Sequence, residues 1–504
     1  MRLLHALCLF VATTSLTAPV AQAAEKKAGR PNILFLLADD QRPDTIAAFG
    51  NPVIKTPHVD SIVRRGFRFS RAYCMGAMGG AVCVPSRAMI NSGRTLFRVK
   101  TNLDGVTVLP ELLRKNGYAT FGTGKWHNQP PAFLRGFEQG KAVFFGGMSN
   151  HIEVPLVDVT PDGKQLRKRI GEKFSSSLFA DAAIDFLENH KDNRPFYAYV
   201  AFTAIHDPRQ APAGYIDMYD PADVPFPKNF MPQHPFFNGW MIGRDEVLAG
   251  FPRTEKVIRM QLAEYYGLMT HMDHEIGRIL NTLKATGHDK NTYIVYAADH
   301  GLAMGSHGLL GKQNLYEHSM GTPLVFAGPG IPEGRTSDAF AYLFDIYPTL
   351  CELTGIKPPA GVEGKSLQGV WQGKQESVRD SVFTAFSKVM RAVRDDRWKL
   401  IRYPHINKSQ LFDLKSDPLE LNDLASKENQ AQRVTRMTAL LAKWQKDLGD
   451  TQPLSSKNPQ SAKIDLTGFK RFPDRHQPDW IVEKYFGGVK AKPRTKKKKK
   501  KKRK

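Results

Sequence analysis

Three short apolar runs in the first 300 residues predict the centre of the fold. Asn32 to Ala38, Phe196 to Phe202 and Thr292 to Ala298 consist almost entirely of apolar, aromatic and β-branched residues. Runs of this length without polar alternation are typical of strands buried on both faces of a parallel sheet. Arg253 to Thr286 instead carries apolar residues at spacings of three and four, which predicts a long helix. The pattern therefore favours an α/β fold.

The pattern changes after a stretch rich in proline and glycine between Pro358 and Gly373. Short strand-like segments follow at Ser381 to Phe386, Met390 to Arg394 and Trp398 to Arg402, separated by charged or turn-forming residues. This spacing predicts an antiparallel sheet. Asn429 to Leu448 is amphipathic and is expected to form a helix that packs on that sheet.

A chain of 504 residues is long enough for a large core and a smaller partner. Residues 30–372 are expected to form a large mixed, mostly parallel sheet flanked by helices. Residues 373–450 are expected to form a smaller C-terminal α+β subdomain on a short antiparallel sheet. Residues 451–489, rich in proline and charge, are predicted to lie on the body as an extended segment.

The first 23 residues have the pattern of a cleavable signal peptide. Arg2 supplies a positive charge, Leu3 to Ala12 is mostly apolar, and Ala21-Gln22-Ala23 provides small residues for cleavage. We therefore expect a secreted or periplasmic protein. No other apolar run approaches the roughly 20 residues of a membrane span, so no span is predicted.

The charge of the chain is concentrated at its C-terminal end. Of the formal net charge of +23, residues 490–504 contribute +12 without a single acidic residue. A run of like charges this long repels itself and is predicted to be disordered. It either contacts polyanions or is an inert solvated tail, and the sequence leaves both interpretations open. Because the N-terminus indicates export, no specific nucleic-acid partner is expected.

The stretch Cys83-Val84-Pro85-Ser86-Arg87 places a potential nucleophile close to a cation. Pro85 fixes its own backbone angle and favours the first turn of a helix. Arg87 would then lie where free backbone N–H groups already favour an anion. The alternative is a buried structural cysteine, because free cysteine is among the most buried residue types.

Acidic residues follow two of the predicted central strands. Asp39 and Asp40 come directly after the first apolar run, and Asp299-His300 follows the run that ends at Ala298. In open α/β sheets, ligands bind outside the carboxyl ends of the strands. Oxygen-dominated ligation favours Ca²⁺ or Mg²⁺ over zinc. The sequence thus predicts one shared divalent metal site.

Two further segments carry candidate polar residues. Gly117 to His127 is predicted to be a short strand followed by a glycine-rich turn that leads to Lys125 and His127. His206 closely follows the apolar run at Phe196 to Phe202. The long segment Asp207 to Trp240 lacks any period and is expected to form an ordered wall of the pocket.

These motifs together resemble the type I (formylglycine-dependent) sulfatases of the alkaline phosphatase-like superfamily. Cys83 to Arg87 matches the family signature, and Gly93-Arg94 lies at the usual spacing after it. The segments around His127, His206 and Asp299 to Lys312 resemble the remaining motif blocks, although His300 stands where some members have Asn. The resemblance covers about residues 32–448.

The resemblance implies that a formylglycine-generating enzyme oxidises Cys83 to formylglycine during maturation. It also implies a metal site holding Ca²⁺, with Mg²⁺ as the alternative, and an active site around it. The implied metal ligands are Asp39, Asp40, Cys83, Asp299 and His300. The implied catalytic residues are Cys83, Arg87, Lys125, His127, His206 and Lys312. Of these, the implied substrate-binding residues are Arg87, Lys125, His206 and Lys312.

A hydrated aldehyde suits sulfate ester hydrolysis for a chemical reason. A plain cysteine or serine nucleophile would form a stable sulfo-enzyme, whereas the second hydroxyl of a hydrate can lose a proton and expel sulfate. The resemblance implies that Asp299 helps to deprotonate the attacking hydroxyl. It further implies that His206, assisted by Lys312, protonates the leaving alcohol and that His127 takes the proton that regenerates the aldehyde.

The sequence therefore favours a sulfuric ester hydrolase acting on an exported or extracellular sulfated substrate, and a sulfated carbohydrate in particular. One alternative is a phosphodiesterase or phosphonate monoester hydrolase on the same scaffold. Another is an inactive protein that binds polyanions. The state of Cys74 and Cys351, paired or free, is left open. His271 and Asp273 on the long predicted helix are within possible reach of the site, but they are expected to be polar surface residues.

Overall fold

Strand β1 (Asn32–Ala38) lies between β8 (Phe196–Ala201) and β9 (Thr292–Ala298) and pairs parallel with both. Its side chains alternate between two hydrophobic cores, one on each face of the sheet. Ile33, Phe35 and Leu37 contribute to the first core, and their neighbours at 34, 36 and 38 contribute to the second. Burial on both faces explains why this run has no polar alternation.

The computed structural model describes residues 29–160, 166–473 and 477–488. The expected signal peptide at residues 1–23 and the basic residues 490–504 lie outside this described part. None of the described helices combines the length and the apolar character needed to cross a bilayer.

In this described part, the large sheet has eleven strands and is mixed. Its centre, in the order β9-β1-β8-β4-β5, is parallel, and antiparallel pairs extend it on both sides. The expected α/β class with a large mixed sheet is confirmed. The other strands are β2 (Gly66–Tyr73), β4 (Ala119–Lys125), β5 (Gln139–Phe144), β6 (Pro155–Val159), β7 (Leu166–Ile170), β10 (Gly321–Thr322), β11 (Leu324–Ala327) and β12 (Arg335–Tyr342).

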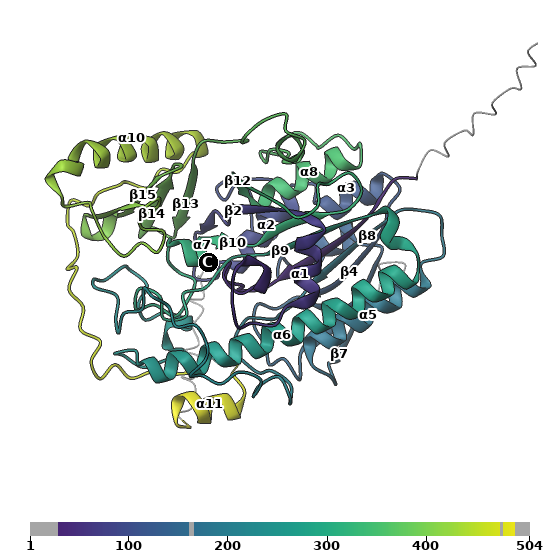
Figure 1. Cartoon of the computed structure of the whole chain (residues 1–504), viewed down its shortest axis with the longest axis horizontal. Coiled ribbons are helices and arrows are strands. Elements are labelled where there is room, and N and C mark those ends of the chain that lie inside the picture. Colours follow the sequence, from purple (N-terminus) through teal and green to yellow (C-terminus); the bar gives the residue numbers. More distant parts are fainter. Residues whose placement is uncertain (1–28, 161–165, 474–476, 489–504) are drawn as a thin grey trace, which may run out of the picture.

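Helices cover both faces of this sheet (Figure 1). The predicted long helix is α6, and the side chain of Thr254 begins it by accepting a hydrogen bond from the backbone N–H of Val257. One face carries α1 (Pro57–Arg64), α5 (Ser175–Asn189) and α6 (Glu255–Ala285). The opposite face carries α2 (Cys83–Ser92), α3 (Leu109–Lys115), α4 (Pro130–Gly136), α8 (Ile346–Leu353) and α9 (Gln368–Trp371). The short helix α7 (Glu317–Met320) directly precedes β10.

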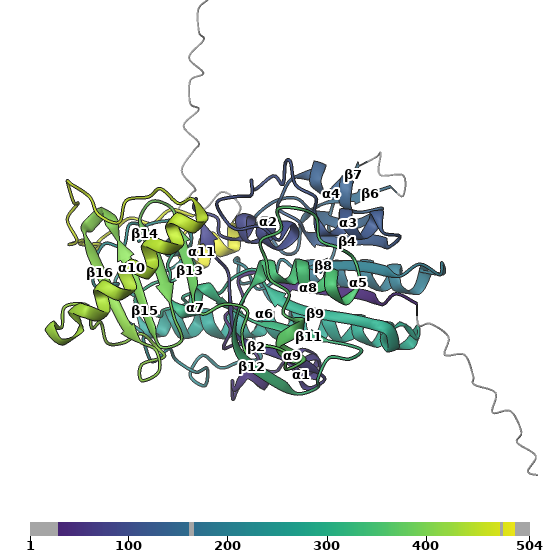
Figure 2. The ribbon, with the colours of Figure 1, turned by 90° about the horizontal axis from the view of Figure 1, so that it is seen from above.

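A second, smaller sheet lies beside the first (Figure 2). Its antiparallel strands are β13 (Val382–Phe386), β14 (Met390–Arg394), β15 (Trp398–Tyr403) and β16 (Lys408–Asp413), and helix α10 (Ala431–Leu448) packs on it. The sequence did not predict its fifth strand, β3 (Gly76–Ala77), which pairs parallel with β13. The N-terminal part of the chain therefore contributes a strand to the small sheet just before Cys83.

The predicted glycine-rich turn before Lys125 is wrong, because these glycines lie within β4. Gly124 has φ +82°, and a Cβ at this position would lie 1.8 Å from the carbonyl oxygen of Ala201. The glycine permits a close approach of β4 to β8 instead of a turn. This approach carries Lys125 to the carboxyl edge of the sheet.

The expected surface position of His271 and Asp273 is also wrong, since both are buried. The Asp273 carboxylate accepts hydrogen bonds from the backbone N–H groups of His58, at 3.2 Å, and Val59, at 2.7 Å. These groups begin α1, where a helix leaves N–H donors without partners. Asp273 therefore joins α6 to α1.

The segment after α10 is extended only in part. Residues 451–473 contain neither helix nor strand, but α11 (Asp479–Phe486) follows. The sequence did not predict this helix. It lies against α6 (Figure 1), where Lys484 and Tyr485 both contact the Glu264 carboxylate.

Candidate active site

The carboxyl ends of four neighbouring parallel strands bring the candidate residues together. Asp39 follows β1, Asp299 follows β9, His206 follows β8, and Lys125 ends β4. Adjacent parallel strands end at one edge of the sheet, so residues separated by more than 250 positions meet there. Two of the site residues, Asp40 and His127, adopt left-handed backbone angles of φ +61° and +67°. Such angles are uncommon outside glycine and cluster at functional sites.

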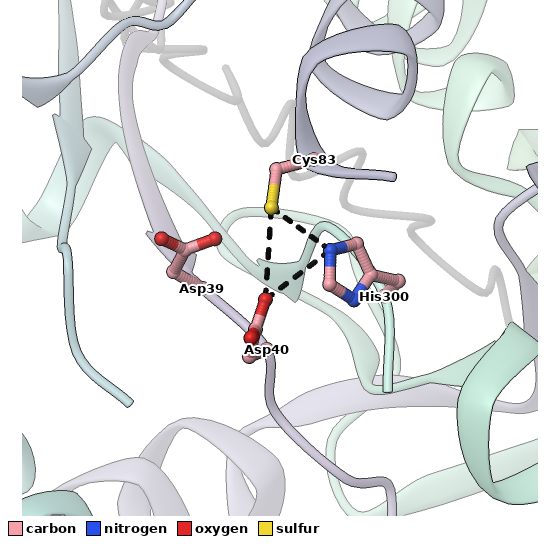
Figure 3. A group of neighbouring side chains, drawn as sticks. All are labelled: Asp39, Asp40, Cys83 and His300. Carbon is pink, nitrogen blue, oxygen red and sulfur yellow. Dashed lines mark hydrogen bonds and ion pairs between the residues drawn. The ribbon is translucent and has the colours of Figure 1, made fainter. Parts of the chain in front are cut away.

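Cys83 begins α2 and points at the acidic cluster (Figure 3). Its Sγ lies 3.1 Å from Nε2 of His300 and 3.6 Å from Oδ1 of Asp40. His300 Nε2 is in turn 3.3 Å from Asp40 Oδ1. One potential ligand atom from each of Asp39, Asp40, Cys83 and His300 lies within 4.8 Å of the others.

Asp299 lies next to this cluster and holds it in place. Its Oδ1 accepts a hydrogen bond of 3.2 Å from the backbone N–H of Asp40 and is 3.6 Å from Nε2 of His300. Its Oδ2 accepts one of 2.9 Å from Nε of Arg87. Burial would raise the pKa of Asp299, but His300 and Arg87 lower it to about 2.

The donor set fits a hard divalent cation. It contains three buried carboxylates, from Asp39, Asp40 and Asp299, and one imidazole nitrogen from His300. Oδ1 of Asp39 is buried and has no hydrogen-bond partner among the described residues. A buried carboxylate oxygen without a donor is costly, and a cation removes that cost. Carboxylate oxygen is the ligand type that Ca²⁺ and Mg²⁺ prefer.

Three buried cations face the same carboxylates. Arg87 Nη2 lies 3.5 Å from Asp39 Oδ1, an ion pair without hydrogen-bond geometry, and Lys125 Nζ contacts the other oxygen of Asp39. Lys312 Nζ lies 2.7 Å from both oxygens of Asp40 and 3.5 Å from Sγ of Cys83. Burial lowers the pKa of Lys312, but Asp40, Cys83 and Asp245 together outweigh this effect and raise it well above its usual value.

His206 and His127 line the same cavity as Cys83. His206 Nδ1 is 2.7 Å from the carbonyl oxygen of Asp207 and 3.2 Å from its Oδ1, which leaves Nε2 on the cavity side. Burial, together with the cations Lys312 and Lys125, holds the pKa of His206 well below its usual value. Burial and Lys125 do the same for His127. A neutral imidazole is ready to accept a proton.

A cavity of about 1010 Å³ opens above these groups. Cys83, His127, His206 and Lys312 line its floor, and the β6–β7 hairpin forms part of its wall. The long segment expected to form a wall contributes Trp240. All the predicted catalytic and metal-binding residues thus lie in or directly beneath one cavity.

Sequence reasoning missed Arg244, which also lines the cavity. Its Nη2 lies 3.3 Å from Nε2 of His206. It also missed Glu246, whose carboxylate accepts the backbone N–H groups of Leu310 and Gly311 and so fixes the turn before Lys312. Both residues lie in a stretch without periodicity or motif, so the sequence offered no signal for them.

The three cysteines among the described residues are free and buried. Cys74 and Cys351 are therefore unpaired, which settles the question that the sequence left open. Burial raises the pKa of the Cys83 thiol well above its usual value, with Lys125 and Lys312 opposing that effect. An unmodified Cys83 would be mostly thiol, and the thiol is the weaker nucleophile.

Comparison with known proteins identifies the family. Residues 31–356 match the family model described as sulfatase, and residues 305–447 match the one described as N-sulphoglucosamine sulphohydrolase, C-terminal. The chain belongs to the sulfatase family. It is accordingly a sulfuric ester hydrolase, and the resemblance drawn from the motifs is confirmed.

Two curated sulfatases match almost the whole chain. An N-acetylglucosamine-6-O-sulfatase of Bacteroides thetaiotaomicron is 26% identical and is aligned over 86% of this chain and 90% of its own length. A sulfatase of Formosa agariphila is 30% identical over 83% of this chain and 88% of its own length. A solved structure in complex with its substrate D-glucosamine-2-N,6-O-disulfate superimposes with a TM-score of 0.72. It is 24% identical and covers 85% of this chain and 100% of its own, so this likeness concerns the fold.

Proposed function

We propose that this sulfatase uses a formylglycine at position 83 and a divalent metal, Ca²⁺ in the first place, to remove sulfate from a sulfated carbohydrate outside the cytoplasm. The observation that carries the proposal is the position of Cys83. Its Sγ lies 3.6 Å from Asp40, 3.1 Å from His300 and 3.5 Å from Lys312, at the floor of the cavity.

Formylglycine at this position would supply a hydrated aldehyde whose hydroxyl attacks sulfur. Among the protein groups, two lysines would bind the sulfate oxygens: Lys312, whose Nζ lies 3.5 Å from Sγ of Cys83, and Lys125, which contacts Asp39. Arg87 anchors Asp299 and, through it, the backbone N–H of Asp40. Donors fixed in a buried site stabilise developing charge without reorganisation, which is a large component of catalysis.

Two histidines supply the proton transfers in this proposal. His206 directs Nε2 into the cavity, while Nδ1 donates to the oxygens of Asp207. A neutral His206 therefore carries its proton on Nδ1 and must first take up a second proton on Nε2, which it would then donate to the leaving alcohol oxygen. His127 lies against Gly147, since a Cβ at Gly147 would come within 2.5 Å of its Nε2, so the glycine leaves room for the imidazole. His127 would accept the proton released when the aldehyde is regenerated. A positioned acid or base of this kind contributes about 10²–10⁴-fold to a rate.

Asp39, Asp40, Asp299 and His300 would hold the metal, which supplies positive charge next to the attacked sulfate. The carboxylates would compensate that charge, and Oδ1 of Asp39, which accepts no hydrogen bond among the described residues, would be available as an oxygen ligand. Oxygen ligands from three carboxylates favour Ca²⁺ or Mg²⁺ over the thiolate- and imidazole-preferring metals.

A sulfated carbohydrate suits the dimensions and lining of the cavity. A volume of about 1010 Å³ exceeds what a sulfate group alone requires, and Trp240 presents an aromatic side chain to it. The matching N-acetylglucosamine-6-O-sulfatase supports a sugar substrate, and the pattern of residues 1–23 supports export. Export would also place the enzyme where sulfated polymers occur.

Mass spectrometry of the peptide containing residue 83, from protein produced with a formylglycine-generating enzyme, tests the proposal. We expect the mass of formylglycine and sulfate release from a panel of sulfated saccharides. Unmodified Cys83 together with an inactive protein would contradict the proposal and favour the polyanion-binding alternative. Faster cleavage of aryl phosphonate or phosphate esters than of aryl sulfates would favour the phosphonate or phosphodiester hydrolase.

A further inference from the structure

The C-terminal segment that contains α11 lies beyond both regions that match family models, which end at residues 356 and 447. It nevertheless reaches the active site. Gln477 Nε2 donates a hydrogen bond of 3.2 Å to Oδ2 of Asp207. Gln477 is 7% exposed and Asp207 is 4% exposed, so the contact is shielded from solvent.

Asp207 is the residue that orients His206. Its Oδ1 lies 3.2 Å from Nδ1 of His206, and its carbonyl oxygen lies 2.7 Å from the same nitrogen. The two carboxylate oxygens thus face different partners: Oδ1 faces the imidazole and, at 4.0 Å, Nη2 of Arg244, whereas Oδ2 accepts from the Gln477 amide. A buried carboxylate that holds one ring nitrogen fixes both the tautomer and the direction of the other nitrogen.

The segment is anchored on both sides of Gln477. Before it, Arg471 Nη1 donates to the carbonyl oxygen of Val247 at 3.2 Å, close to Arg244 in sequence. After it, Ile481 is 1% exposed, and Lys484 and Tyr485 both contact Glu264 of α6. The Gln477 amide is therefore held against Asp207 by contacts that the family-matched part of the chain makes with this segment.

We propose that Gln477 is a positioning residue for His206, acting through Asp207, and that the C-terminal segment thereby completes the proton-donating side of the active site. This inference rests on the proposed role of His206 as the acid for the leaving alcohol. Loss of the amide would let the Asp207 carboxylate rotate and would leave Nδ1 of His206 with a less fixed partner. The loss would slow the step in which the alcohol leaves, because His206 is the proposed acid for that step.

The test compares two sulfate esters that differ in their need for a proton. An alkyl or sugar sulfate has a poor leaving group and depends on the acid, whereas nitrophenyl sulfate has a good leaving group and depends on it little. Release of sulfate from the enzyme is common to both, so the ratio of their kcat/KM values isolates the leaving step. The variants are Gln477→Leu, which keeps the volume, and Gln477→Glu, which places a carboxylate against Asp207.

A positioned acid raises the rate of a reaction that needs it by about 10²–10⁴-fold. Gln477→Leu removes only the positioning of the acid, so we expect kcat/KM to fall about tenfold for the alkyl sulfate. For nitrophenyl sulfate, kcat/KM should fall less than about twofold. Gln477→Glu should lower the ratio of kcat/KM for the alkyl sulfate to kcat/KM for nitrophenyl sulfate further than Gln477→Leu does. Trp480→Ala, on the exposed side of α11 with 42% exposure, is the matched control and should leave both substrates unchanged.

Equal losses for both esters in Gln477→Leu and Gln477→Glu, or no loss in either, would overturn the inference. Thermal unfolding of each variant identifies a folding defect, and the ratio between substrates does not depend on the fraction of folded enzyme. Failure of the proposed function would look different. In that case the wild-type protein itself would release sulfate from neither ester or would retain an unmodified Cys83.

Discussion

Lys312 and a bound metal should compete for the same carboxylate, which makes Lys312→Met the most informative substitution. Lys312 Nζ lies 2.7 Å from both oxygens of Asp40, and both side chains are 1% exposed. Removing one partner of a buried pair leaves an uncompensated charge and costs about 3–5 kcal/mol. In the metal-free protein we therefore expect a loss of unfolding free energy of that order.

With Ca²⁺ bound, the loss should be smaller, because the metal then compensates Asp40. A difference of about 2 kcal/mol between the metal-free and metal-loaded losses corresponds to about 30-fold tighter Ca²⁺ binding in the variant. Ca²⁺ binding and folding stability are thermodynamically linked. The increase in Ca²⁺ affinity and the difference between the two stability losses must therefore give the same coupling free energy. Calorimetric titration of Ca²⁺ and denaturant unfolding with and without Ca²⁺ provide the two values.

The control is Lys168→Met, which removes an exposed lysine from the wall of the same cavity without touching the acidic cluster. Its Ca²⁺ affinity and stability should match the wild type. Unchanged Ca²⁺ affinity in Lys312→Met, or equal stability losses with and without Ca²⁺, would refute the view that the lysine and the metal share Asp40.

Three further predictions concern single positions. Cys83→Ala should abolish sulfate release, by at least about 10³-fold in kcat, because the nucleophile is lost; full activity in this variant would contradict the assignment. Gly124→Ala should lower the free energy of unfolding, measured with denaturant, by more than about 4 kcal/mol, because the new Cβ would lie 1.8 Å from a carbonyl oxygen. The control is Gly105→Ala, where φ is +73° but no atom lies within 4 Å of the new Cβ. This variant should lose only about 1–2 kcal/mol. Burial raises the pKa of Asp273 to about 7. The folded state therefore keeps a proton on Asp273 that the unfolded state loses above about pH 4. Because of this difference, the free energy of unfolding should fall as the pH rises from about 4 to 7. Asp273→Asn should flatten that slope in pH-dependent unfolding, and an unchanged slope would contradict the assignment.

The central fold was predictable because its signal is local. β1, β8 and β9 are buried on both faces, and such strands appear in the sequence as unbroken apolar runs. The acidic and basic residues that follow them could be assigned to one site because parallel strands end at one edge. In contrast, β3 consists of Gly76 and Ala77 alone, and a strand of two residues carries no pattern.

The prediction failed where a contact across the fold decides a residue's environment. The sequence does not show whether a glycine forms a turn or allows two strands to come close together. Gly124 allows β4 to approach β8, because the backbone of Ala201 lies against it. Asp273 looked like a surface residue on α6, but the start of α1 covers it and uses its carboxylate. Arg244 and Gln477 reach His206 and Asp207 only through the tertiary fold.

The balance of charge explains how one arrangement can be stable and still attract an anion. Three carboxylates, from Asp39, Asp40 and Asp299, face three cations, from Arg87, Lys125 and Lys312, so the formal charge of this group is zero without a metal. A divalent cation held by these carboxylates would make the group positive by two, and it would share carboxylates that the lysines otherwise occupy. The lysines would then be available to an anionic ester. A sulfate monoester with one negative charge leaves the group positive, whereas a doubly charged phosphate monoester would neutralise it completely. The same residues are therefore electrostatically able to bind either ester, so charge alone does not choose between them. Rates of hydrolysis of aryl sulfates and of aryl phosphate or phosphonate esters would thus discriminate the two chemistries more sharply than substrate binding.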